Sequence, residues 1–263
     1  MIRIKFLLPS QAKGEAWYQE WFQESELPED WFEKWEKFRD DKKDGDELDP
    51  KVWGRLKGYL FALFRKKCAY CESHVQHVYS GEVDHYRPKS AVKEDPSHGG
   101  YGWLAYEMEN FLPSCKPCNA GKGKQTQFPV IEGTRAQTPR QVAREKPLLL
   151  NPCDDDPDRS PERHLSFRVV LNGKDLPGMV EGITPEGRAT VGICNLNRGL
   201  LVERRHRAQK DAQRELFVRL ANADGPDGVL SARKEVCAEW LEYAVARQHA
   251  VEYWLQITMS KAG

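Results

Sequence analysis

The sequence Cys68-Ala69-Tyr70-Cys71 opens the segment on which this fold depends; it is followed by Val83-Asp84-His85-Tyr86-Arg87-Pro88 and by Asn110-Phe111-Leu112-Pro113-Ser114-Cys115-Lys116-Pro117-Cys118-Asn119. Two Cys-x-x-Cys pairs therefore enclose an Asp-His pair and two spaced asparagines. A segment of this length cannot bury a large core of its own, so an ion shared by the two pairs would stabilise it. We expect the chain to fold around residues 68–124.

The cysteine pairs predict a structural zinc. A Cys-x-x-Cys turn places two sulfurs on one side of an ion, and zinc binds thiolates in a tetrahedron. The sequence supplies one such set: Cys68, Cys71, Cys115 and Cys118. A redox-active dithiol is the alternative interpretation. His74 and His77 are alternative ligands near the first pair, but four cysteines already complete the shell.

Composition indicates a charged globular protein. The 263 residues carry 40 basic and 40 acidic side chains, and eight tryptophans are available for a core. The apolar run near Met1 is too short for a signal peptide, and no stretch is long enough to cross a bilayer. We therefore expect a soluble, cytoplasmic protein without a membrane partner. In a reducing compartment, paired cysteines favour metal binding over disulfides, and Cys153, Cys194 and Cys237 are expected to be free thiols.

Hydrophobic spacing predicts an α+β protein in four regions. We expect residues 1–66 to be mainly helical and residues 67–126 to form the core with the zinc knuckles. Residues 127–147 are expected to form a basic loop beside the core, suited to a substrate flap. Residues 148–263 are expected to be mainly helical, with a short hairpin. Net charge is zero, but 15–49 is acidic and 116–146 is basic, so a nucleic acid partner is compatible with the composition.

Several elements can be placed within these regions. Asp49-Pro50 predicts a helix start, followed by an apolar face, and residues 198–220 predict a basic helix. We also expect a short strand over 2–8, a hairpin formed by residues around Val75 and Val83, and a short helix that starts at Asn119. Toward the C-terminus we expect a strand over 165–171 closed by Asn172-Gly173, a loop over 224–228, and a last helix capped by Ser231 with Trp240 pointing inward.

Asp84 and His85 have the chemistry of a phosphodiesterase. A neutral imidazole can take a proton from water near pH 7, and an adjacent carboxylate can hold a hard cation. Neighbours on an extended strand point in opposite directions, so both can serve one site only if the strand bends, which Pro88 favours. An isolated Asp-His dipeptide is a weak signal.

The whole pattern resembles the HNH, or ββα-metal, nuclease family. An Asp-His pair followed by proline, then asparagine, then Cys-x-x-Cys-Asn covers residues 68 to about 124. The resemblance implies that His85 is the general base and that Asn110 braces the loop that orients it. It also implies that Asp84 and Asn119 hold the catalytic metal, on a zinc-stapled ββα core. Oxygen ligands favour Mg²⁺ or Mn²⁺ over zinc at that second site.

The sequence segments that flank the motif are similar to those of one branch of this family, the PtuB-like nuclease subunit of Septu-type and retron-linked anti-phage systems. These segments include Trp103-Leu104-Ala105-Tyr106-Glu107, Leu148-Leu149-Leu150-Asn151-Pro152-Cys153 and Leu196-Asn197-Arg198. The resemblance implies an antiviral defence role beside an ABC-type ATPase subunit. It also implies hydrolysis of DNA to 5′-phosphate ends, with the metal stabilising the departing 3′-oxygen.

Five basic residues near the motif are candidate phosphate contacts: Arg87, Lys89, Lys116, Lys122 and Lys124. Each is equally compatible with ordinary surface charge. Two other functions remain open: a zinc-ribbon module that binds nucleic acid without cleaving it, and a subunit whose main role is docking to an ATPase. His85 and the two asparagines favour cleavage, because binding alone needs none of them.

Overall fold

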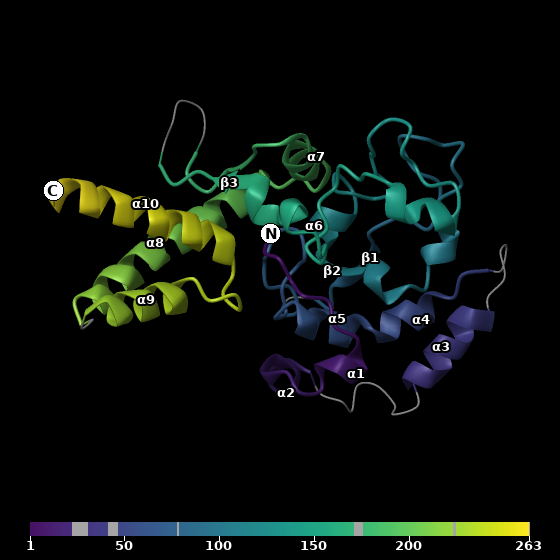
Figure 1. The fold of residues 1–263 in the computed structure, drawn as a ribbon, viewed down its shortest axis with the longest axis horizontal. Coiled ribbons are helices and arrows are strands. Elements are labelled where there is room, and N and C mark those ends of the chain that lie inside the picture. Colours follow the sequence, from purple (N-terminus) through teal and green to yellow (C-terminus); the bar gives the residue numbers. More distant parts are fainter. Residues whose placement is uncertain (23–30, 42–46, 78, 171–175, 223–224, 263) are drawn as a thin grey trace.

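The computed structural model describes residues 1–22, 31–41, 47–77, 79–170, 176–222 and 225–262. Helices surround two small antiparallel sheets, so the chain is an α+β protein as the sequence predicted (Figure 1). Within the described residues, no helix is long and apolar enough to cross a membrane.

The first sheet pairs β1 (Glu82–His85) with β2 (Phe111–Ser114), in the register Glu82↔Ser114 to His85↔Phe111. Helix α6 (Lys116–Asn119) follows β2 directly. The predicted hairpin of residues around Val75 with Val83 is therefore wrong, because the partner of β1 comes after a long insertion that contains the 3₁₀ turns Gly102–Leu104 and Met108–Asn110. Asn119 ends α6 and does not start it.

In the described residues before this sheet, the helices are α1 (Pro9–Ala12), α2 (Ala16–Trp21), α3 (Trp31–Asp41), α4 (Pro50–Arg55) and α5 (Lys57–Leu63). The predicted helix start is confirmed, since the Asp49 side chain accepts a hydrogen bond from the Lys51 amide at the N-terminus of α4. Helix α5 is buried against β2 and α2. The expected strand over 2–8 does not form; instead the Ile4 amide donates one bond to the Pro152 carbonyl.

Among its described residues, the C-terminal part contains a second sheet, β3 (Leu165–Phe167) with β4 (Val180–Gly182), and four helices. These are α7 (Pro185–Ile193), α8 (Gly199–Leu220), α9 (Gly225–Val236) and α10 (Ala244–Ala262). Helix α8 confirms the basic helix. The prediction of a loop over 224–228 is wrong, because α9 begins at Gly225. Ser231 lies inside α9 and does not cap a helix, and Trp240 is 53% exposed and does not point inward. The turn at Asn172-Gly173 lies outside the described residues.

Short 3₁₀ turns complete the described elements: Pro139–Arg144, Pro157–Arg159 and Pro161–Arg163. In the described residues, one hydrophobic core has members from Met1 to Ala246 and includes all four knuckle cysteines. A second, smaller cluster lies between α8, α9 and α10, which extend to one side in Figure 1. Its members are Ala212, Leu216, Ala232, Val236, Cys237 and Val251. The C-terminal helices thus have packing of their own.

Candidate metal centre and nuclease site

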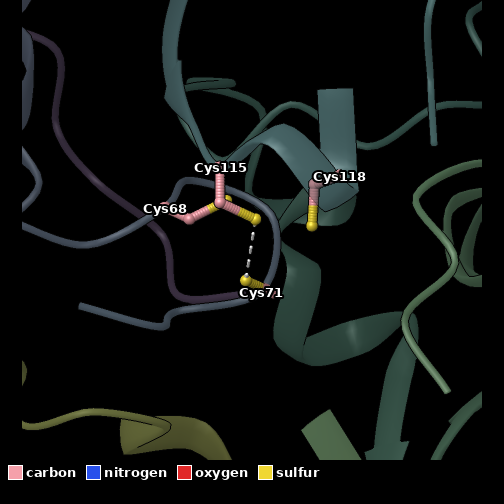
Figure 2. Close-up of side chains that lie close together, drawn as sticks. All are labelled: Cys68, Cys71, Cys115 and Cys118. Carbon is pink, nitrogen blue, oxygen red and sulfur yellow. Dashed lines mark hydrogen bonds between the residues drawn. The ribbon is translucent and has the colours of Figure 1, made fainter. Parts of the chain in front are cut away.

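The four knuckle cysteines meet in one buried cluster (Figure 2). All four sulfurs lie within 4.8 Å of one another, and Cys71 Sγ is 3.8 Å from Cys115 Sγ. A tetrahedron with Zn–S bonds of about 2.3 Å has edges of about 3.8 Å. All seven cysteines are free thiols. The cluster can therefore bind a metal such as zinc.

Local backbone turns bring each pair together. The Glu72 amide donates to the Cys68 carbonyl and the Cys118 amide donates to the Cys115 carbonyl, which closes the two knuckles. The Ala69 amide donates to the Pro113 carbonyl at 2.8 Å and fixes the first knuckle on β2. His74 is not part of the cluster, since its Nε2 lies 3.1 Å from the Trp240 carbonyl oxygen. In the described part of the chain, this is the one group of three or more His, Cys, Asp or Glu side chains placed to hold an ion.

Asp84 is buried in β1 and both its carboxylate oxygens have partners. Tyr70 donates its hydroxyl to Oδ2 at 2.6 Å, and the Lys124 ammonium donates to Oδ1 at 3.0 Å. Burial raises the pKa of Asp84, and the positive charge of Lys124 opposes that shift. The carboxylate therefore already has a buried cationic partner.

Gly123 explains how Lys124 reaches this position. A side chain at residue 123 would clash with the Cys118 carbonyl, since its Cβ would lie 2.3 Å from that oxygen. The chain can therefore turn tightly below α6, where the Lys124 amide donates to the Cys118 carbonyl at 2.7 Å. The Lys124 side chain then points inward and also donates to the His85 carbonyl at 2.7 Å.

His85 ends β1 and contacts different partners from Asp84. Its Nε2 lies 3.0 Å from the Ala105 carbonyl oxygen, and its ring packs edge-on against Trp53 and Phe111. Burial, followed by the nearby charge of Lys89, lowers the pKa of His85 to about 3. The imidazole is therefore neutral at pH 7. Because a carbonyl can only accept, Nε2 carries the proton and Nδ1 presents a lone pair.

Asn110 ties together the two ends of the insertion between β1 and β2. Its Oδ1 accepts from the Arg87 amide at 2.8 Å, and its Nδ2 donates to the carbonyls of Arg87 and Leu104 at 3.0 and 3.2 Å. Leu104 precedes Ala105, whose carbonyl contacts His85. Asn110 therefore fixes the backbone that orients the imidazole.

Asn119 and Glu82 face each other across α6 and β1. Nδ2 of Asn119 donates to Oε2 of Glu82 at 2.7 Å. Residues two apart on a strand share a face, so Glu82 lies on the same side of β1 as Asp84. The Glu82 carboxylate and the Asn119 carboxamide therefore lie beside each other, and oxygen donors of these types are the ligands that Mg²⁺ prefers in proteins.

The candidate phosphate contacts differ in exposure. Lys116 and Lys122 are exposed, and Lys89 is half-buried with its ammonium 5.1 Å from the Trp53 ring centre. Lys124 is fully buried, and its ammonium forms an ion pair with the Asp84 carboxylate. A contact from any of them to phosphate stays a prediction.

Arg87 joins a buried network that sequence reasoning missed. Its Nε donates to Glu145 at 2.7 Å, and the same carboxylate accepts from the Tyr101 hydroxyl at 2.6 Å and the Ala136 amide at 3.0 Å. Glu145 therefore anchors the basic loop over 127–147 to the insertion. Glu145 is one of two acidic residues in this basic loop, with Glu132, and the sequence gives no sign of which of them is buried. For Tyr70, which donates to Asp84, the only signal in the sequence is its position between Cys68 and Cys71.

Comparison with known proteins gives a partial match. No family model matches the chain, and no solved structure matches it. It is 35% identical over 163 residues to Septu protein PtuB of Bacillus mycoides (strain KBAB4), which covers 60% of this chain and 52% of that protein. Septu protein PtuA of the same strain is 33% identical over 159 residues, covering 57% of this chain and 20% of PtuA.

A second PtuB, from Bacillus thuringiensis, is 29% identical over 151 residues, which is 56% of this chain and 44% of that protein. The chain thus spans about half the length of the PtuB relatives that it matches. The similarity supports the Septu-type branch that the sequence motifs indicated. Over more than half of its length, this chain is similar to the Septu proteins PtuB and PtuA.

Proposed function

We propose that the chain is a metal-dependent endonuclease of the HNH type that cleaves DNA in anti-phage defence. One observation supports the proposal: β1 carries Asp84 and His85, Asn110 directly precedes β2, and Asn119 ends α6, so the four candidate residues belong to one small β-β-α unit. The similarity to Septu proteins supports the defence role.

In this proposal His85 is the general base. The Ala105 carbonyl holds the Nε2 proton, so Nδ1 is the atom that accepts a proton from the attacking water. The low pKa of the buried, neutral imidazole keeps it unprotonated at pH 7. A bound phosphate would bring negative charge near the ring and raise this pKa, which makes proton transfer easier as substrate binds.

Asp84 and Asn119 are the residues that would hold a divalent cation, with Glu82 orienting the Asn119 carboxamide. A bound Mg²⁺ or Mn²⁺ would supply positive charge for the scissile phosphate and the departing 3′-oxygen. Lys124 donates to Asp84 Oδ1 and Tyr70 donates to Oδ2, so a cation held by Asp84 would compete with these donors for the carboxylate. Exposed Lys116 and Lys122, together with half-buried Lys89, would attract the DNA backbone.

We further propose that an ABC-type ATPase subunit is the partner of this nuclease. The similarity to PtuA as well as PtuB supports an assembly of Septu type. Exposed apolar side chains on or near the C-terminal helices offer surface for it: Leu200, Phe217, Val218, Leu230 and Trp240. Size-exclusion chromatography with the product of the neighbouring gene tests this association, and separate elution would contradict it.

Plasmid nicking tests the nuclease proposal. Supercoiled DNA should convert to nicked and linear forms with Mg²⁺ and remain supercoiled without it. Persistent supercoiled DNA at high protein concentration with Mg²⁺ and Mn²⁺, together with a mobility shift, would favour the zinc-ribbon binding module instead.

A further inference from the structure

A metal-loaded four-cysteine cluster poses an electrostatic problem in this fold. Four thiolates around Zn²⁺ leave a net charge of −2, and all four cysteines are buried. A buried charge without a compensating partner is strongly unfavourable. Positive groups must therefore lie close to the sulfurs.

Arg198 supplies the first of these positive groups. Its Nη1 lies 3.4 Å from Cys118 Sγ and its Nη2 lies 3.7 Å from Cys115 Sγ, so the two arms of one guanidinium reach both sulfurs of the second knuckle. Nη1 also donates to the Asn195 carbonyl at 3.1 Å, which fixes the orientation of the guanidinium. Arg198 lies 80 residues from Cys118 in the sequence, so this contact links two distant parts of the chain.

Arg205 supplies the second positive group. It lies seven residues after Arg198, which is about two turns along the same face of α8. It is buried, and its Nη1 donates to the Leu196 carbonyl at 2.7 Å. Burial lowers the pKa of Arg205, and the nearby Cys71, Glu72 and Cys118 oppose that shift. Arg198 is also the N-cap residue of α8, so its contact with the sulfurs fixes the N-terminal end of this helix.

The turn that carries Arg198 is fixed to the C-terminal sheet. Asn197 accepts from the Val180 amide and donates to the Val180 carbonyl, both at 2.8 Å. Asn195 adopts a left-handed backbone with φ of 48°. The start of α8 is thus joined to β4 on one side and to the cysteine cluster on the other.

We propose that Arg198 is a positioning residue of the cysteine centre, which, with Arg205, balances the charge of the metal-loaded cluster and thereby docks the N-terminal end of α8 on the core. Metal binding then does more than close the two knuckles: it holds the C-terminal helices in place. The inference rests on metal binding by the four cysteines and is independent of whether the chain cleaves DNA.

Zinc release to a chromogenic chelator tests the role of Arg198. Arg198→Met keeps an unbranched apolar stem and removes the guanidinium, and we expect it to release zinc about 10 to 100 times faster than wild type, the range for lost partners of metal ligands. Arg198→Lys keeps the positive charge but cannot reach both sulfurs at once, so its rate of zinc release should lie between those of wild type and Arg198→Met. Arg207→Met removes an exposed guanidinium from the same helix and should match wild type. Equal release by Arg198→Met and Arg207→Met would overturn the proposal.

Hydrogen exchange in the wild-type chain tests the docking without any substitution. After zinc removal, the amides of residues 201–205 should lose protection, while the separate cluster formed by Ala212, Val236 and Val251 stays protected. Continued protection of 201–205 would contradict docking by the metal. Loss of protection in both places together would show that zinc stabilises the whole fold, and would equally overturn a specific role for α8.

Discussion

Replacing Lys124 with methionine tests the most unusual contact of the candidate nuclease site. The Lys124 ammonium bonds Asp84 Oδ1 at 3.0 Å and the His85 carbonyl at 2.7 Å, and the side chains of Lys124 and Asp84 are 0% and 5% exposed. Methionine fills similar volume but leaves the Asp84 carboxylate with Tyr70 alone. Breaking a buried ion pair by removing one partner costs about 3–5 kcal/mol.

The expected loss is large enough to measure by thermal unfolding. At roughly 2–4 °C per kcal/mol for a chain of this size, Lys124→Met should lower Tm by about 6–20 °C without added divalent metal. Lys122→Met is the matched control, because Lys122 is exposed and two residues away, and its Tm should stay close to that of wild type.

Divalent metal should reverse part of this loss. In the wild type a cation must compete with Lys124 for Asp84, whereas in Lys124→Met it meets a carboxylate without that competitor. Millimolar Mn²⁺ should therefore raise the Tm of Lys124→Met more than that of wild type, by about 1.4 kcal/mol of stability for each tenfold gain in affinity. A Lys124→Met protein as stable as Lys122→Met, or one with no greater response to Mn²⁺, would refute this account of the ion pair.

Two further substitutions separate the cysteine centre from the Asp84 site. Cys68→Ser should lose zinc and the fold of residues 68–124 together, since a structural site contributes folding energy directly. Elemental analysis measures the zinc and circular dichroism measures the fold. A folded Cys68→Ser protein that keeps one zinc would contradict this prediction. Asp84→Asn should raise the Mg²⁺ concentration needed for half-maximal cleavage while zinc content stays at wild type, and mild EDTA should stop cleavage without unfolding the chain; release of zinc by Asp84→Asn would show that the two sites are not independent.

Local features of the fold could be predicted from the sequence. The Cys-x-x-Cys turns and the Asp49 cap depend on residues within three or four positions, so their geometry follows directly from the order of residues. The basic helix over 198–220 follows for the same reason. The pairing of β1 with β2 could not be derived from local signals.

Distant contacts could not be predicted. Strand β1 was assigned the wrong partner because the residues of β2 follow an insertion of irregular structure. The inward position of Lys124 depends on the tight turn at Gly123 below α6, and a basic residue near the motif gave no sign of it. The sequence gives no sign of the role of Arg198, because its contact with Cys118 spans 80 residues.

Single-turnover cleavage by His85→Ala is the most direct test of the proposed nuclease. With Mg²⁺ and saturating DNA, loss of the general base should lower the cleavage rate by about 10²–10⁴-fold. Zinc content and DNA affinity should stay at wild-type values, because His85 contacts Ala105, Trp53 and Phe111 and not the cysteines. Cleavage by His85→Ala at close to the wild-type rate would contradict the assignment of His85 and the mechanism built on it.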